Sequence, residues 1–148
     1  MTKSIFLAAP ISGFHDDKLY NTCRTGLMDL ITVLQREYNV YSELISIDSL
    51  DSYDDPGIAI KRDLEMIDNS DFFIIYHPCY MQTSTFIELG YAIAKRKRII
   101  VIGKKDSLPY LSLGLLSYDC RTTIIDSSEL NESTNELVIK SLKDIEFI

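Results

Sequence analysis

Glu88 is the first residue whose type and position could do chemistry. The apolar run "DFFIIYH" (71–77) predicts a strand, and the helix expected over 84–97 places Glu88 in its first turn. Two interpretations stay open for this side chain. Thr85-x-x-Glu88 fits a capping box, in which Glu88 would bond the start of its own helix. At the end of a strand, Glu88 could instead be a nucleophile.

Asp63 is the second candidate. In the helix expected over 58–69, Ile60, Leu64 and Ile67 form one apolar stripe, and Asp63 lies on the shoulder of that stripe. The same spacing puts Arg62 on the outer face. Asp63 could simply cap or pair at the surface. Together with Glu88, however, it could break a glycosidic bond, because that reaction uses one carboxylate that attacks and one acid that protonates the leaving group.

Hydroxyl groups precede the helix that carries Glu88, in the segment "MQTSTF" (81–86). Such groups at a helix N-terminus can hold a phosphate or a sugar, and ordinary N-capping explains them equally well. The chain has no GxGxxG and no Walker loop, and no Ser-His-Asp arrangement stands out. His77, Cys79 and Tyr80 lie in the same region without a pattern that indicates catalysis.

Strands and helices alternate along the whole chain. Apolar runs predict strands at 4–9, 39–46, 71–77, 98–104 and 121–126, and helical spacing predicts helices at 16–37, 58–69, 84–97 and 131–143, with a short helix or ordered loop at 108–118. Fully apolar strands alternating with helices indicate a parallel sheet covered on both faces. We therefore expect one domain, 1–148, with a flavodoxin-like, doubly wound, five-stranded sheet of order 2-1-3-4-5.

This architecture predicts where a ligand would bind. In open parallel sheets, ligands bind outside the carboxyl ends of the strands, beside the point where the strand order reverses. Here that point lies between the first and third strands, so the loops 10–14 and 77–85 should border the site. Glu88 follows directly after the second of these loops.

Composition restricts the class of partner. The chain has 148 residues, 22 acidic against 15 basic, and a net charge of −7, which argues against nucleic acid or an anionic membrane. Three scattered cysteines without a CxxC and only two histidines predict no metal cluster and no cofactor. The N-terminal apolar run is too short for a signal peptide, and no apolar stretch has the length of a membrane span. We expect a cytoplasmic protein.

Three segments together resemble the nucleoside 2-deoxyribosyltransferase family, which includes relatives that hydrolyse deoxynucleoside monophosphates. The segments are "FLAAPISG" (6–13), "RDLEMIDNSDFFII" (62–75) and "STFIELGYAIAKRKRIIVI" (84–102). The resemblance covers roughly 4–114, and "ELGYA" followed by a basic pair and an apolar run is its most specific part. It implies a flavodoxin-like fold and cleavage of an N-glycosidic bond with retention.

The resemblance also implies roles for individual residues. Glu88 would be the nucleophile that forms a glycosyl-enzyme intermediate, and Asp63 would contact or protonate the base. Family members are usually homo-oligomers, a dimer or higher, and Ser112 would contact a neighbouring subunit's phosphate. The substrate, a small nucleoside or nucleotide, would be bound by Phe6, Pro10, Ile11, Ser12, Gly13, Gln82, Ser84, Thr85 and Ser112.

Two departures from the family pattern concern the pocket. Many members have a tyrosine at the position of Phe6, with its hydroxyl near the nucleophile, and Phe6 cannot supply that group. Many have glycines just before the glutamate, where this chain has Ser84 and Phe86. Phe86 is therefore expected to narrow or reshape the pocket, and the substrate could differ from a plain deoxynucleoside.

Two other functions remain open at the level of sequence. A TIR-like enzyme that cleaves NAD would also use a glutamate on a helix after a strand of a parallel sheet, and its leaving group needs no proton. A nucleotide-binding module without catalysis would bind a ligand and not consume it. The sequence does not distinguish transfer to a second base from hydrolysis, or ribose from deoxyribose.

Overall fold

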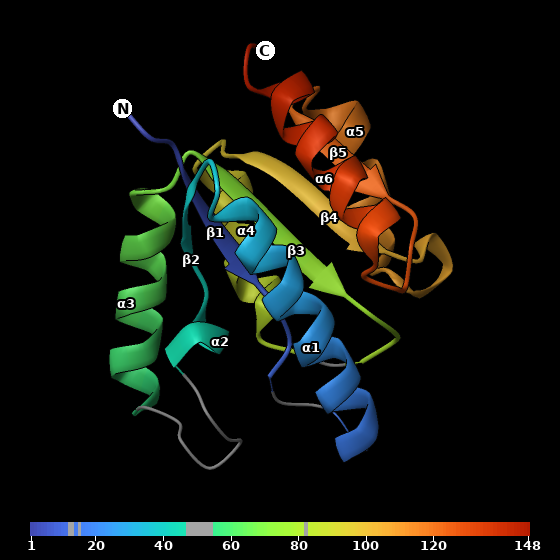
Figure 1. Ribbon diagram of the computed structural model, residues 1–148. Coiled ribbons are helices and arrows are strands. Elements are labelled where there is room, and N and C mark those ends of the chain that lie inside the picture. The colour runs from blue at the N-terminus through green and yellow to red at the C-terminus, as the bar shows by residue number, and fades with distance from the viewer. Residues whose placement is uncertain (12–13, 15, 47–54, 82) are drawn as a thin grey trace.

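The structure is a computed structural model, described here for residues 1–11, 14, 16–46, 55–81 and 83–148 (Figure 1). Its centre is a five-stranded sheet of order β2-β1-β3-β4-β5 in which every strand pairs in parallel with its neighbours. The strands are β1 (Ser4–Ala8), β2 (Asn39–Tyr41), β3 (Phe72–His77), β4 (Arg98–Gly103) and β5 (Thr122–Ile125). The prediction of a flavodoxin-like sheet with this strand order is confirmed.

Helices cover both faces of the sheet because successive side chains of each strand point to opposite faces. On one face, Ile5 and Leu7 of β1 pack with α1 (Asp17–Leu34) and α6 (Glu132–Ile145). On the other face, Phe6 and Ala8 pack with α3 (Pro56–Asp68) and α4 (Thr85–Ala94). All six residues of β3 are buried, which explains the continuous apolar run of that segment.

Polar residues mark the starts of three helices. Asp16 accepts a hydrogen bond from the backbone N–H of Lys18 at the start of α1, and Asn131 accepts one from Thr134 at the start of α6. Asp55 accepts bonds from the first turn of α3, so this helix begins at Pro56 rather than at 58. The segment 108–118, expected as a short helix or ordered loop, forms two short pieces, η2 (Tyr110–Gly114) and α5 (Leu115–Tyr118), and the 3-10 turn η1 (Lys105–Ser107) precedes it.

The prediction of a strand over 39–46 is wrong in its second half. Only three residues of β2 pair with β1, and the chain then turns into the short helix α2 (Glu43–Ser46). The backbone N–H of Ile45 donates to the carbonyl of Ser42, and this turn brings Leu44 into the core. Because the turn ends the strand, Glu43 leaves the sheet and joins the edge where the strands end.

The buried side of α3 also differs from the expected stripe. Ile60 is 48% exposed, whereas Asp63 is only 8% exposed and Ile67 is fully buried. Asp63 thus lies in the packed face of the helix rather than on its shoulder. In the described part of the chain, no helix combines the length and the apolarity that crossing a membrane requires.

Candidate active site

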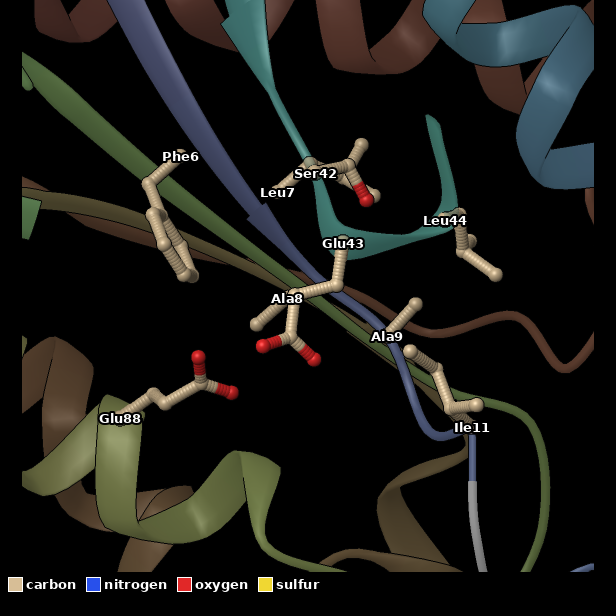
Figure 2. Close-up of a pocket in the computed structure, with 9 residues that line it drawn as sticks. All are labelled: Phe6, Leu7, Ala8, Ala9, Ile11, Ser42, Glu43, Leu44 and Glu88. Atoms are coloured by element: carbon tan, nitrogen blue, oxygen red, sulfur yellow. The ribbon is translucent and has the colours of Figure 1, made fainter. Parts of the chain in front are cut away.

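Glu88 reaches a small cavity beside the carboxyl end of β1 (Figure 2). Figure 2 shows the carboxyl group of Glu88 extending from α4 toward that of Glu43, which comes from α2 on the opposite side. The space between them is about 10 Å³, room for about one water molecule. The cavity is lined by Phe6, Leu7, Ala8, Ala9, Ile11, Ser42, Glu43, Leu44 and Glu88.

The capping-box interpretation of Glu88 does not match this geometry. Thr85 is the first helical residue of α4, and its hydroxyl bonds that of Thr83 at 3.3 Å. Ser84 occupies the N-cap position and makes no side-chain cap hydrogen bond. Glu88 therefore turns away from its own helix start and into the cavity, as a residue of the strand-end site should.

Asp63 enters the same site from α3. The phenol of Tyr41, the last residue of β2, donates a hydrogen bond of 3.2 Å to Asp63 Oδ1. The Nε atom of Arg62 lies 3.6 Å from the same oxygen. Arg62 was expected on the outer face of its helix, and that expectation is wrong because its guanidinium folds back over α3 toward two carboxyl groups.

Glu43 is the second carboxyl group that Arg62 contacts. The Nη2 atom of Arg62 donates to Glu43 Oε1 at 3.1 Å, so one guanidinium lies against both Glu43 and Asp63. Three carboxyl groups from three different helices thus meet at one end of the sheet, with one arginine beside them. This arrangement confines negative charge in a place with little water, where like charges repel strongly.

The protonation of two carboxyl groups reflects this crowding. Burial, followed by the charges of Asp63 and Glu43, raises the pKa of Glu88 to about 9. Burial, followed by a hydrogen bond with Asp63 and the charge of Asp63, raises the pKa of Glu43 to about 7, although Arg62 opposes this rise. Acids with separated pKa values in one site are what acid–base chemistry at neutral pH requires.

The aromatic wall of the site is built from three adjacent strands, β2, β1 and β3. Phe6 stacks on Phe73 of β3, with ring centroids 5.6 Å apart, and its ring lies 5.3 Å from that of Tyr41. Phe6 and Tyr41 are partners in the register of β1 and β2. The hydroxyl that Phe6 lacks therefore enters this site from Tyr41, on the neighbouring strand.

The structure brings only some of the expected binding residues to this cavity. Phe6 and Ile11 line it, while Pro10, which is buried beside them, does not. Ser84 is exposed, Thr85 is buried at the start of α4, and Ser112 is buried within η2; none of these three lines the cavity of Glu88. Ser12, Gly13 and Gln82 lie outside the described residues.

Phe86 lies against a different cavity. Its ring meets that of His77 edge-on, with centroids 5.0 Å apart, and both residues line a space of about 480 Å³ beside Tyr80 and Tyr110. The expectation that Phe86 narrows the pocket of Glu88 is not supported, because residues two apart in a helix point in widely different directions. Among the described residues, no group of His, Cys, Asp or Glu side chains has an arrangement that could hold a metal ion.

Sequence reasoning missed three residues of this site: Tyr41, Glu43 and Arg62. Glu43 was assigned to the second strand, although "YSEL" does place a carboxylate close to the carboxyl end of that strand. The second strand borders the first, so its end also lies at the edge where ligands bind in such sheets. The position of Glu43 near the carboxyl end of the second strand was the signal in the sequence that could have identified it.

Several solved structures share this fold, although no model of a protein family and no curated protein sequence matches the chain. A CMP N-glycosidase of Clostridium botulinum, BcmB, has a TM-score of 0.68 and 24% identity over 93% of this chain and 99% of its own. BlsM has a TM-score of 0.80 and 16% identity over 97% of this chain and 91% of its own. A conserved protein from Enterococcus faecalis V583 has a TM-score of 0.65 and 17% identity, covering 97% and 99% of the two chains. At these identities the likeness establishes the fold.

Proposed function

We propose that this protein cleaves the N-glycosidic bond of a nucleotide, with Glu88 as the nucleophile. The observation that carries the proposal is the position of the Glu88 carboxyl group, which extends from α4 toward the carboxyl group of Glu43 at the strand-end cavity. The likeness in fold to a CMP N-glycosidase over almost the whole chain supports it. Cytidine monophosphate is therefore the first substrate to test.

In the proposed reaction, Glu88 first passes its proton to the neighbouring carboxyl groups as the substrate enters. Its ionised oxygen then forms a bond to C1′ while the bond from C1′ to the base breaks. The electron pair of the broken bond stays on the base nitrogen, which takes up a proton from an acid of the site. Water or a second base then attacks C1′, releases Glu88 and returns the sugar with its original configuration. The site needs no metal or organic cofactor for these steps.

Asp63 would position the base. Its side chain is held from two directions by Tyr41 and Arg62, so its orientation is restricted before any ligand binds. A side chain fixed in this way gives up little freedom on binding, which favours precise contact with a substrate. The present space at Glu88 admits about one water, so a sugar would have to separate the carboxyl groups as it enters.

The proposal is tested by one chromatographic assay with a panel of substrates. Wild type and Glu88→Ala would be incubated with cytidine monophosphate, other ribonucleotides and deoxynucleotides, deoxynucleosides with a spare free base, and NAD. We expect free base from a monophosphate with wild type and none with Glu88→Ala. Glu132→Ala is the matched control, because Glu132 also lies in a first helical turn but is exposed.

Each other outcome has a definite meaning. Base exchange without net hydrolysis would indicate a deoxyribosyltransferase. Release of nicotinamide alone would favour a TIR-like enzyme that cleaves NAD. Full activity in Glu88→Ala would exclude Glu88 as the nucleophile, and binding of a nucleotide without consumption would indicate a non-catalytic module.

We also propose that the protein forms a homo-oligomer through its β4–β5 connection. Tyr110 and Leu111 are 87% and 84% exposed, and Tyr80 next to them on the same cavity is 85% exposed. Large apolar side chains gathered on one surface are typical of contacts between proteins. Ser112 lies within this segment, which is where the resemblance expects a contact with a neighbouring subunit.

A further inference from the structure

Two neighbours contact the same carboxyl oxygen of Asp63. Tyr41 donates its hydroxyl hydrogen to Asp63 Oδ1 at 3.2 Å, and the positive guanidinium of Arg62 lies 3.6 Å from that oxygen. Both contacts stabilise a carboxylate that accepts, rather than a carboxylic acid that donates. Asp63 is therefore poorly placed to carry the proton that a departing base needs.

The carboxyl group of Glu43 lines the cavity directly and points at Glu88, whereas Asp63 does not line the cavity (Figure 2). Among the residues that the structure describes, the charged and titratable groups that face Glu43 include Tyr41 from β2, Arg62 and Asp63 from α3, and Glu88 from α4. Glu43 is thus the carboxyl group that a molecule held at Glu88 would meet on the opposite wall.

Among the described residues of the site, acidic groups outnumber basic ones. Glu43, Asp63 and Glu88 contribute three carboxyl groups, and Arg62 contributes one positive charge. Like charges that lie close together in a place with little water repel strongly. Such a set keeps at least one proton in neutral water, and the protons belong to the set as a whole.

We propose that Glu43 is the acid that protonates the departing base, while Asp63, held by Tyr41 and Arg62, positions the base. This assignment rests on the proposed function and names the proton donor of the same site. When the bond between C1′ and the base breaks, its electron pair remains on the base and takes the Glu43 proton. When water later attacks C1′, its proton passes to ionised Glu43, and the site returns to its starting state.

A substrate whose leaving group needs no proton can distinguish Glu43 as a general acid from Glu43 as a structural residue. Cytosine leaves with a proton, whereas nicotinamide leaves nicotinamide mononucleotide as a neutral molecule without one. We expect Glu43→Gln to lower kcat/KM on cytidine monophosphate by about 10²- to 10⁴-fold, the usual contribution of a general acid. On nicotinamide mononucleotide, kcat/KM of the same variant should stay within about threefold of wild type, because kcat/KM reports the steps up to departure of the base and not the later attack by water.

The pH profile provides the second readout. Burial and the contact with Asp63 hold the pKa of Glu43 near neutrality, at about 7. A general acid must be protonated, so kcat/KM of wild type on cytidine monophosphate should fall at alkaline pH, where Glu43 and Glu88 together lose their last proton, and Glu43→Gln should lose this fall. If nicotinamide mononucleotide is not consumed, the pH profile alone decides.

The experiment compares Glu43→Gln, Asp63→Asn and Glu88→Gln with Glu65→Gln, a control on the exposed side of α3. Circular dichroism and Tm would verify that each variant is folded. The assignment would be overturned if Glu43→Gln lost kcat/KM equally on both substrates. It would also be overturned if only Asp63→Asn removed the fall of kcat/KM with rising pH. No base release by wild type, or full activity in Glu88→Gln, would instead mean that the proposed function is wrong.

Discussion

The phenol oxygen of Tyr41 donates a hydrogen bond of 3.2 Å to Oδ1 of Asp63. Tyr41 is the register partner of Phe6, and the two rings lie 5.3 Å apart. A hydroxyl on the first strand is common in the family that this sequence resembles. Here Tyr41 on the neighbouring strand β2 supplies a hydroxyl to the same region of the site.

Tyr41→Phe should weaken catalysis by releasing Asp63. A hydrogen bond to a charged group contributes about 1.5–3 kcal/mol, so we expect kcat on cytidine monophosphate to fall by about 10- to 100-fold. Phe6→Tyr in the same chain should recover part of the loss by restoring a hydroxyl from the first strand. Steady-state kinetics of the single and double variants would measure both effects.

Tyr91→Phe is the control for Tyr41. Its hydroxyl donates to Asp68 at 2.9 Å, in the same way but at the exposed ends of α3 and α4. This variant should keep the wild-type kcat. If Tyr41→Phe behaves like Tyr91→Phe, then Tyr41 has no role in positioning Asp63.

Glu88→Gln should stabilise the fold, and increasingly so as the pH rises. The pKa of Glu88 is about 9 in the folded protein against an ordinary value of 4.5, so between these values the folded state binds more protons than the unfolded chain. Stability therefore falls as the pH rises through that range. Glutamine removes this dependence and should add about 1–2 kcal/mol at pH 8, or about 2–8 °C in Tm.

Thermal unfolding of wild type and Glu88→Gln at pH 5 and pH 8 would measure this difference. Glu132→Gln, in the first turn of α6, should change little at either pH because that side chain is exposed. An equal Tm difference at both pH values would show that Glu88 does not hold its proton in the folded protein.

Arg62→Met should move the pH profile to higher pH. The guanidinium lowers the pKa of Glu43, so its removal raises that pKa further above its ordinary value. If Glu43 is the acid, the fall in kcat/KM at alkaline pH should then begin at a higher pH. Lys61→Met, on the exposed side of the same helix, should leave the profile unchanged. A profile that moves to lower pH in Arg62→Met would contradict the arrangement.

Leu111→Asp should dissociate the proposed homo-oligomer. Leu111 is 84% exposed in the β4–β5 connection, so a charge there should cost the isolated chain little but oppose an apolar contact between copies. Sedimentation velocity of wild type should show a dimer or larger species, and that of Leu111→Asp a smaller one. Leu137→Asp, half-exposed on α6, should keep the wild-type species. A monomeric wild type at micromolar concentration would exclude the oligomer.

Much of the fold could be predicted because the signals are local and repeated. Apolar runs such as "DFFIIYH" become strands buried on both faces, and parallel pairing then requires helices between them. Errors arose where packing outweighed local pattern. "NVYSELIS" reads as one strand, but burial of Leu44 ends it after three residues and turns the chain into α2.

The sequence by itself determined the sheet, its strand order and the edge where Glu88 lies, because these follow from hydrophobic periodicity and the chain order of the elements. Only the tertiary structure decided which side chains meet Glu88 there. It turned Asp63 inward and Ile60 outward, brought Glu43 opposite Glu88, and put Phe86 on another cavity. The rotation of each helix about its axis is set by the fit of its whole surface against the sheet, and a shift of a few tens of degrees changes which residue faces the site.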